Sequence, residues 1–186
     1  MIDTSDFRNG MSIILDNEIY LIVEFQHVKP GKGPAFVRTK LRSMKSGGTL
    51  EKTFRAGEKM EQAVLERKKM TFLYNQGEEY VFMDGESFDQ VEVSAAQIGS
   101  GVKYLKDNTE VEICAHNDKI LTVELPFFME LEVTQTDPGL RGDTASGGSK
   151  PATLETGAVV NVPLFINVGE KIRVDTRTDS YLERVK

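Results

Sequence analysis

The sequence contains few of the residues that disulfides, metal centres and catalytic pairs require. Its 186 residues include one cysteine and two histidines. Cys114 cannot form an internal disulfide, and the surrounding apolar pattern Val111-Glu-Ile-Cys-Ala115 predicts a buried structural thiol. His27 and His116 are far apart and lack a nearby cysteine pair, so neither a zinc site nor a nucleophile–base pair is indicated. We therefore expect no metal, no cofactor and no enzymatic activity.

Long hydrophobic runs are also missing. No apolar run approaches the roughly 20 residues that a membrane-spanning helix needs. The amino terminus, Met1-Ile-Asp-Thr-Ser-Asp6, has neither the basic segment nor the apolar segment of an export signal. The sequence therefore predicts a soluble, cytoplasmic protein that has no membrane partner.

Acidic residues are absent between Glu24 and Glu51, although the chain as a whole is acidic, with a net charge of −6 and a pI near 5.1. An acidic protein is by itself a poor candidate for binding nucleic acid. The charge is unevenly distributed, however, because residues 1–63 carry 10 basic and 8 acidic side chains, whereas residues 64–186 carry 13 and 21. A local basic patch therefore survives in an acidic chain.

The acid-free window has the pattern of a hairpin. Tyr20–Gln26 has the composition of a strand, Pro30-Gly-Lys-Gly-Pro34 that of a turn, and 35–42 alternates. Lys32 is therefore expected at a hairpin tip. Because strand side chains alternate, one face of the second strand packs and the other is cationic and favours RNA. The packing face holds Ala35, Val37, Thr39 and Leu41, and the other holds Phe36, Arg38, Lys40 and Arg42.

Short strand patterns separated by turns fill the chain, which predicts an all-β fold of small barrels, and five-stranded barrels of the OB type fit modules of this size. A helical turn is expected at 58–63 and a short helix at 95–99. Breaks near 63–66 and at Pro126 predict modules 1–64, 65–126 and 127–186. The expected strands are 12–15, 20–26, 35–41, 50–54, 70–74, 79–83, 88–93, 110–115, 120–125, 128–134, 158–162, 164–167 and 171–175.

Two motifs, Lys29-Pro-Gly-Lys-Gly-Pro-Ala-Phe36 and the segment Arg141–Ala158, together resemble the bacterial elongation factor P family. The similarity runs the whole length, through 53–59, 80–84, 162–165 and 174–178. The resemblance implies an SH3-like (KOW-like) barrel followed by two OB barrels, arranged as an L of roughly tRNA shape. It also implies binding to the 70S ribosome beside peptidyl-tRNA, contact with ribosomal RNA, and relief of stalling at consecutive prolines.

The resemblance assigns the functional tip position to Lys32, within the loop Pro30, Gly31, Gly33 and Pro34. Lys32 would hold the CCA end of the tRNA in a reactive pose, which is positional help and not acid–base chemistry. The flanking cations Lys29, Arg38, Lys40 and Arg42 would contact phosphates. The tip residue is modified in many members of the family. A lysine excludes the rhamnosyl-arginine branch and leaves open whether a lysine-modifying enzyme acts. Pro30 and Pro34 each fix φ, so the loop is expected to be stiff enough for unmodified lysine to work.

The glycine-rich segment 142–157 resembles a loop that lies near the small subunit in the family, and glycine lets its backbone approach phosphates or bases. The order G-x-x-x-x-G-K-[ST] is missing, so no nucleotide site is predicted. The candidate contacts are Arg141, Gly142, Asp143, Gly147, Gly148 and Lys150.

Two alternatives stay open. A general OB-fold RNA-binding protein or chaperone would use aromatic stacking on a barrel face with a basic groove, although the acidic remainder of the chain disfavours it. A divergent paralogue of the factor would carry a different tip, so Lys32 favours the standard factor. In each case we expect a monomer.

Overall fold

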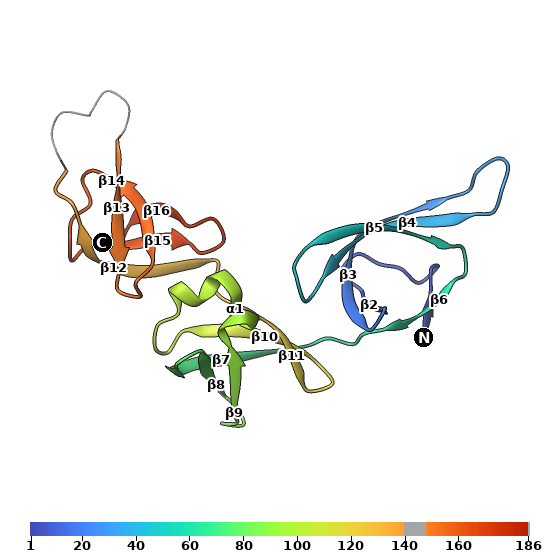
Figure 1. Cartoon of the computed structure of the whole chain (residues 1–186), viewed down its shortest axis with the longest axis horizontal. Coiled ribbons are helices and arrows are strands. Elements are labelled where there is room, and N and C mark those ends of the chain that lie inside the picture. The colour runs from blue at the N-terminus through green and yellow to red at the C-terminus, as the bar shows by residue number, and fades with distance from the viewer. Residues whose placement is uncertain (140–147, 186) are drawn as a thin grey trace. The chain divides into compact units, whose positions relative to one another are not determined.

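The structure, a computed structural model, describes residues 1–139 and 148–185. These residues form strands β1 to β16, the short helix α1 (Ala95–Ile98) and the 3₁₀ helix η1 (Gly99–Tyr104) (Figure 1). The predicted all-β fold is thereby confirmed. None of the described helices has the length and apolar composition that crossing a membrane requires.

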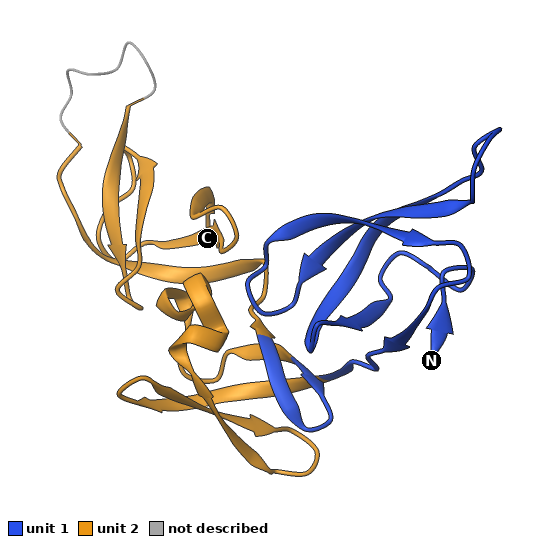
Figure 2. Cartoon of the chain, turned by 45° about the vertical axis from the view of Figure 1, so that its right-hand side comes forward, with its two compact units in different colours: residues 1–67, 114–122 blue, residues 68–113, 123–186 orange. Residues whose placement is uncertain are grey.

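The chain divides into two compact units, coloured separately in Figure 2. Unit 1 comprises residues 1–67 and 114–122, and unit 2 comprises residues 68–113 and 123–186. The amino-terminal sheet has the strand order β1-β6-β2-β3-β4-β5. Its strands are β1 (Ile2–Asp3), β2 (Ser12–Leu15), β3 (Glu18–Val28), β4 (Phe36–Ser43), β5 (Thr49–Arg55) and β6 (Lys59–Gln62).

Aromatic rings fill the core of the amino-terminal sheet. Phe7 is fully buried and meets Phe25 and Phe54 edge to face, with ring centroids 6.3 and 5.8 Å away. Met60 joins this core from β6, where it pairs with Ile2. The helical turn expected at 58–63 is therefore wrong, because pairing with β1 and β2 holds this segment extended.

The second sheet has the order β11-β10-β7-β8-β9. The predicted short helix forms as α1 between β9 and β10, and the Ser94 N–H at its amino end donates to the Gln97 side chain at 3.1 Å. Cys114 is 1% exposed, as predicted. The strands are β7 (Glu66–Gln76), β8 (Glu79–Asp84), β9 (Gln90–Ser94), β10 (Glu110–His116) and β11 (Lys119–Glu124).

The remaining strands close into a barrel of order β12-β13-β14-β16-β15. Residues 164–167, expected as a strand, instead form a turn in which the Ile166 N–H donates to the Pro163 carbonyl at 3.1 Å. The loop expected over 142–157 is wrong for Ser149–Leu154, which form β13, whereas 155–157 form a turn. The strands are β12 (Phe128–Thr136), β13 (Ser149–Leu154), β14 (Val159–Pro163), β15 (Lys171–Asp175) and β16 (Ser180–Arg184).

One aromatic side chain links η1 to the closed barrel within unit 2. Tyr104 is fully buried and belongs to the same hydrophobic core as Leu131, Val162 and Ile172. Its hydroxyl donates to Asp179 Oδ1 at 2.7 Å, and the Lys103 ammonium donates to Asp179 Oδ2 at the same distance. Lys103 and then Tyr104 lower the pKa of Asp179 by hydrogen bonding to its charged form. The ring of Tyr104 is thus part of the barrel core, and its hydroxyl group has a hydrogen-bond partner.

Candidate nucleic-acid interface

The predicted hairpin is formed by β3 and β4. Their ladder ends at the pair Val28↔Phe36, and the neighbouring ladder of β4 and β5 ends at Phe36↔Arg55. Residues 29–35 therefore lie beyond the paired strands, in the loop that extends past β3 and β4 in Figure 1. Every residue from Lys29 to Pro34 is exposed, so the expected tip position of Lys32 is confirmed.

The loop is compact around Gly33. This residue adopts a φ of +112°, which side chains rarely tolerate, and a Cβ placed on it would lie 3.8 Å from Pro30 Cγ. The ring of Pro30 therefore lies close to Gly33, although the two residues are separated by Gly31 and Lys32 in the sequence. No hydrogen bond or ion pair joins Lys32 to any other residue in the described ranges 1–139 and 148–185. The loop thus presents an ammonium group that is free to meet a partner.

The two faces of β4 differ in character as the alternation predicts. Val37, Thr39 and Leu41 are at most 1% exposed, whereas the basic side chains between them are exposed. The Thr39 hydroxyl donates to the Lys52 carbonyl at 2.7 Å, and the Ser43 hydroxyl oxygen accepts from the N–H groups of Lys45 and Ser46 at 3.2 and 3.1 Å, so both polar side chains on the buried face have partners. The exposed basic residues are Arg38, Lys40 and Arg42.

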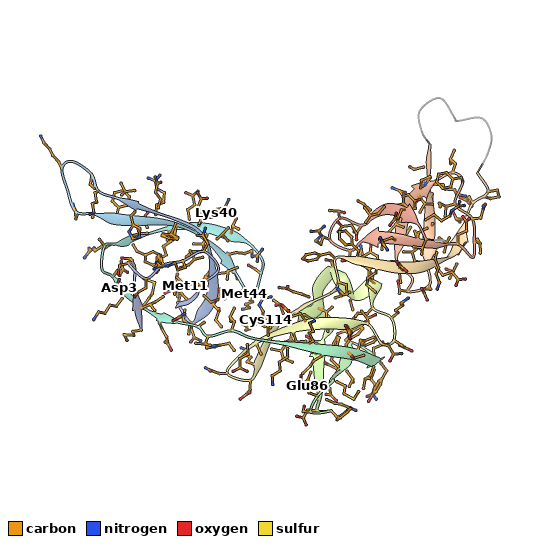
Figure 3. All side chains as sticks on the ribbon, turned by 180° about the vertical axis from the view of Figure 1, so that it is seen from behind. Asp3, Met11, Lys40, Met44, Glu86 and Cys114 are labelled. Carbon is orange, nitrogen blue, oxygen red and sulfur yellow. The ribbon has the colours of Figure 1, made fainter. Side chains whose placement is uncertain are left out.

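Strand pairing makes the exposed face less uniform than the sequence suggests. Lys40, labelled in Figure 3, lies directly opposite Glu24 of β3 and Glu51 of β5. These two glutamates bound the acid-free window in the sequence, and the β-bulge at Val23 brings the first of them into register. Side chains directly opposite on neighbouring strands can interact, so the two carboxylates make the surroundings of Lys40 less positive.

The two arginines of β4 have neutral neighbours. Arg38 lies opposite Gln26 and Thr53, and Arg42 lies opposite Leu21 and Thr49. Opposite charges on the same face are therefore farther from each arginine than from Lys40. Of the three cations on this face, the two arginines have no carboxylate directly opposite them.

Arg55 is a further exposed cation at this edge, and the sequence analysis missed it. It pairs with Phe36, the residue next to the tip loop. Counting outward from the Gly47-Gly48 turn between β4 and β5 would have placed it there, because an antiparallel register follows from the turn position.

Of the six candidate contact residues in the carboxy-terminal segment, the structure describes only Gly148 and Lys150. Arg141, Gly142, Asp143 and Gly147 lie outside the described residues. Gly148 immediately precedes β13.

Lys150 lies within β13 and is only 6% exposed, with its ammonium donating to the Asp137 carbonyl at 2.6 Å. Asp137 follows β12, so this hydrogen bond ties the end of one strand to the start of the next. Lys150 faces the barrel interior with Ala152 and Leu154, because residues two apart share a face. We therefore omit it from the surface contacts.

Three family models cover most of the chain. "Elongation factor P (EF-P) KOW-like domain" matches residues 3–60, "Elongation factor P (EF-P) OB domain" matches 65–123, and "Elongation factor P, C-terminal" matches 129–184. These models bear out the predicted order of a KOW-like barrel and OB barrels.

Curated relatives match over the full length. The chain is 60% identical over 185 residues to "Elongation factor P" of Pelotomaculum thermopropionicum, with all of both chains covered. It is 60% identical to the protein of that name in Natranaerobius thermophilus, covering 100% of this chain and 99% of the relative. With the protein of that name in Nocardia farcinica it shares 58% identity at the same coverage.

Solved structures share the fold at lower identity. "Eukaryotic translation initiation factor 5A from Methanococcus jannaschii" superposes with a TM-score of 0.54 at 23% identity, covering 66% of this chain and 92% of that one. A "translation initiation factor eif-5a family protein" from Naegleria fowleri gives a TM-score of 0.54 at 16% identity, with 67% and 96% covered. This likeness concerns the fold alone.

Proposed function

The chain belongs to the elongation factor P family of translation factors, and from this premise we propose that it promotes peptide-bond formation on ribosomes stalled at consecutive prolines. It binds beside the peptidyl-tRNA and contacts the tRNA and ribosomal RNA. It acts in the cytoplasm as a monomer. The three matched ranges support module boundaries near residues 64 and 126.

The observation that carries this proposal is the free ammonium of Lys32 at the end of a short, exposed loop. Proline reacts slowly because its ring fixes φ and its nitrogen is a constrained secondary amine. A cation placed near the CCA end restricts the tRNA to reactive poses, which lowers an entropic part of the barrier. The protein positions the substrate and the ribosome performs the chemistry, so the protein itself is not an enzyme.

The geometry of the tip bears on modification. Pro30 lies beside Gly33, and Pro30 and Pro34 each fix their own φ. A loop ordered in advance loses less entropy when it inserts between RNA strands. This stiffness supports activity of the unmodified lysine, and an enzymatic extension of Lys32 would add reach to the same position.

Arg38 and Arg42 are the proposed phosphate contacts of β4, together with Lys29 of the loop. We expect Arg38→Ala and Arg42→Ala each to weaken ribosome binding and to lower the slope of log affinity against log salt by about 0.7–0.9, because each loses one phosphate contact. Lys40→Ala serves as the matched control, since Lys40 alone of the three has carboxylates, those of Glu24 and Glu51, directly opposite it. Equal losses for all three variants would contradict this assignment. Salt titrations of binding to 70S ribosomes provide the measurement.

A purified translation system tests the proposed function. Synthesis of a reporter with three consecutive prolines should rise when the protein is added, and synthesis of a matched reporter with alanines should not. Equal stimulation of both reporters would contradict the proline-specific role. Binding to ribosomes that hold peptidyl-tRNA should also exceed binding to free single-stranded RNA, since a general RNA-binding protein would reverse that order.

A further inference from the structure

The turn between β8 and β9 carries an aromatic residue in a strained position. Phe88 is 68% exposed and adopts a φ of +62°. This left-handed region favours Gly, Asn and Asp, and a bulky side chain there is an outlier. The sequence pattern predicts Phe88 in a strand, but β9 begins only at Gln90. An apolar ring is thus held in water on an unfavourable backbone, which calls for a role outside the folding of the chain.

Hydrogen bonds fix this turn closely. The Asp84 N–H donates to the Asp89 carbonyl at 2.9 Å, and the Phe88 N–H donates to the Asp84 carbonyl at 3.0 Å. Asp84 Oδ1 accepts hydrogen bonds from the N–H groups of Glu86 and Ser87 at 2.8 and 3.3 Å. The Ser87 hydroxyl donates to Asp89 Oδ2 at 2.8 Å. The ring of Phe88 therefore projects from a backbone that is ordered before any partner arrives.

The turn that carries Phe88 is itself acidic, although Lys68 and Lys69 lie beside it on β7, next to the Asp84 partner Met70. Residues 70–102 include six acidic side chains and no lysine or arginine. Three of the carboxylates, those of Asp84, Glu86 and Asp89, belong to the turn itself, and Figure 3 labels Glu86 on it. Hydrogen bonds from the Glu86 and Ser87 N–H groups lower the pKa of the Asp84 carboxyl, and Lys68 on β7 adds a smaller attraction. Such a surface repels the phosphates of RNA and attracts cations on a protein.

We propose that the turn 84–89 is a protein-docking knob. Phe88 inserts into an apolar pocket on a basic protein surface, and the carboxylates of Glu86 and Asp89 face the cations around that pocket. The inference rests on the proposed function, since it assigns this part of the factor to a protein of the ribosome, whereas the basic face of β4 contacts RNA. Exposed aromatic anchors commonly dominate the affinity of protein interfaces.

The first test replaces Phe88 by glycine. Phe88→Gly relieves the backbone strain, so the melting temperature should stay equal or rise, while affinity for 70S ribosomes should fall about tenfold. Asn108→Gly is the matched control, because Asn108 of unit 2 has a φ of +64° and no aromatic ring. It should bind like the wild type. Unchanged binding by Phe88→Gly would overturn the proposal.

The second test distinguishes protein from RNA by the sign of the effect. Glu86→Lys should weaken ribosome binding at low salt if the partner is a basic protein, and tighter binding would overturn the proposal in favour of RNA. A photo-crosslinking benzoyl-phenylalanine at position 88 should attach to a ribosomal protein. Attachment to RNA, or no attachment while the factor is bound, would also overturn it.

Rescue of the proline reporter by the wild type is measured in parallel. If the wild type neither binds nor rescues, the proposed function fails and this inference with it, whereas rescue without any effect of Phe88→Gly contradicts this inference alone.

Discussion

Lys32→Ala is expected to reduce synthesis of the triple-proline reporter to the rate observed without the protein. The side chain is exposed and has no partner among residues 1–139 and 148–185, so its removal leaves the fold unchanged. Exposed substitutions of this kind usually alter stability by less than about 0.5 kcal/mol. The whole effect should therefore appear in translation, because the positioned cation is lost and the tRNA regains its unproductive poses.

Lys45→Ala is the matched control for this experiment. Its side chain is 83% exposed and lies 3.6 Å from Glu18 in the same amino-terminal sheet, away from the tip loop. The Lys45→Ala variant also loses one positive charge, and it should leave the rate of reporter synthesis unchanged. Full activity of Lys32→Ala would refute the positional role of the tip. Intact-mass measurement of the protein from its native cells would show in addition whether Lys32 carries an extension.

The largest loss of stability is expected from Tyr104→Ala. Tyr104 is fully buried in the core of the closed barrel although it belongs to η1. Truncation of a buried aromatic ring typically costs about 3–5 kcal/mol, because apolar burial is lost and a cavity remains. Urea denaturation should therefore show a lower midpoint for unit 2.

Tyr104→Phe separates the ring from the hydroxyl. It keeps the packing and removes the hydrogen bond to Asp179, so a cost of about 1 kcal/mol is expected. Asp179 retains Lys103 as a partner in this variant. Equal costs for the alanine and phenylalanine variants would mean that the hydroxyl, and not the ring, holds η1 in the barrel.

The sequence predicted the hairpin well because two independent signals agree there. Glycine and proline mark the turn around Lys32, and the alternation from Val37 to Arg42 marks the strand. Local propensity and burial both follow from residue type at these positions, so no distant contact is needed to infer them.

Predictions that depended on distant partners were less accurate. The carboxylates opposite Lys40, those of Glu24 and Glu51, come from neighbouring strands and could not be placed from local sequence. Lys150 resembles a loop cation in sequence, yet its burial depends on pairing with β14 and on the Asp137 carbonyl. Met60 lies in a strand because Ile2, far away in sequence, pairs with it. Tertiary context overrides local propensity in each case.

The segment around Phe88 illustrates a different kind of error. Its composition is that of a strand, and its backbone angle contradicts that preference. Natural sequences tend to be locally consistent, so residues that break the pattern concentrate at functional positions. The predicted strand 88–93 is confirmed from Gln90 onward as β9, and the two residues where it begins too early include Phe88 of the proposed docking knob.

The closed hydrogen-bond order of the carboxy-terminal barrel also bears on self-association. Each of its five strands has two neighbours, so the described part of this barrel offers no open strand to another chain. The amino-terminal sheet, by contrast, ends at β1 and β5. Strand β1 has only two residues, and β5 contains the charged residues Glu51, Lys52 and Arg55. A short edge strand and a charged edge strand both disfavour edge-to-edge aggregation. The amino-terminal sheet and the carboxy-terminal barrel therefore offer little edge through which copies of the chain could pair into fibrils.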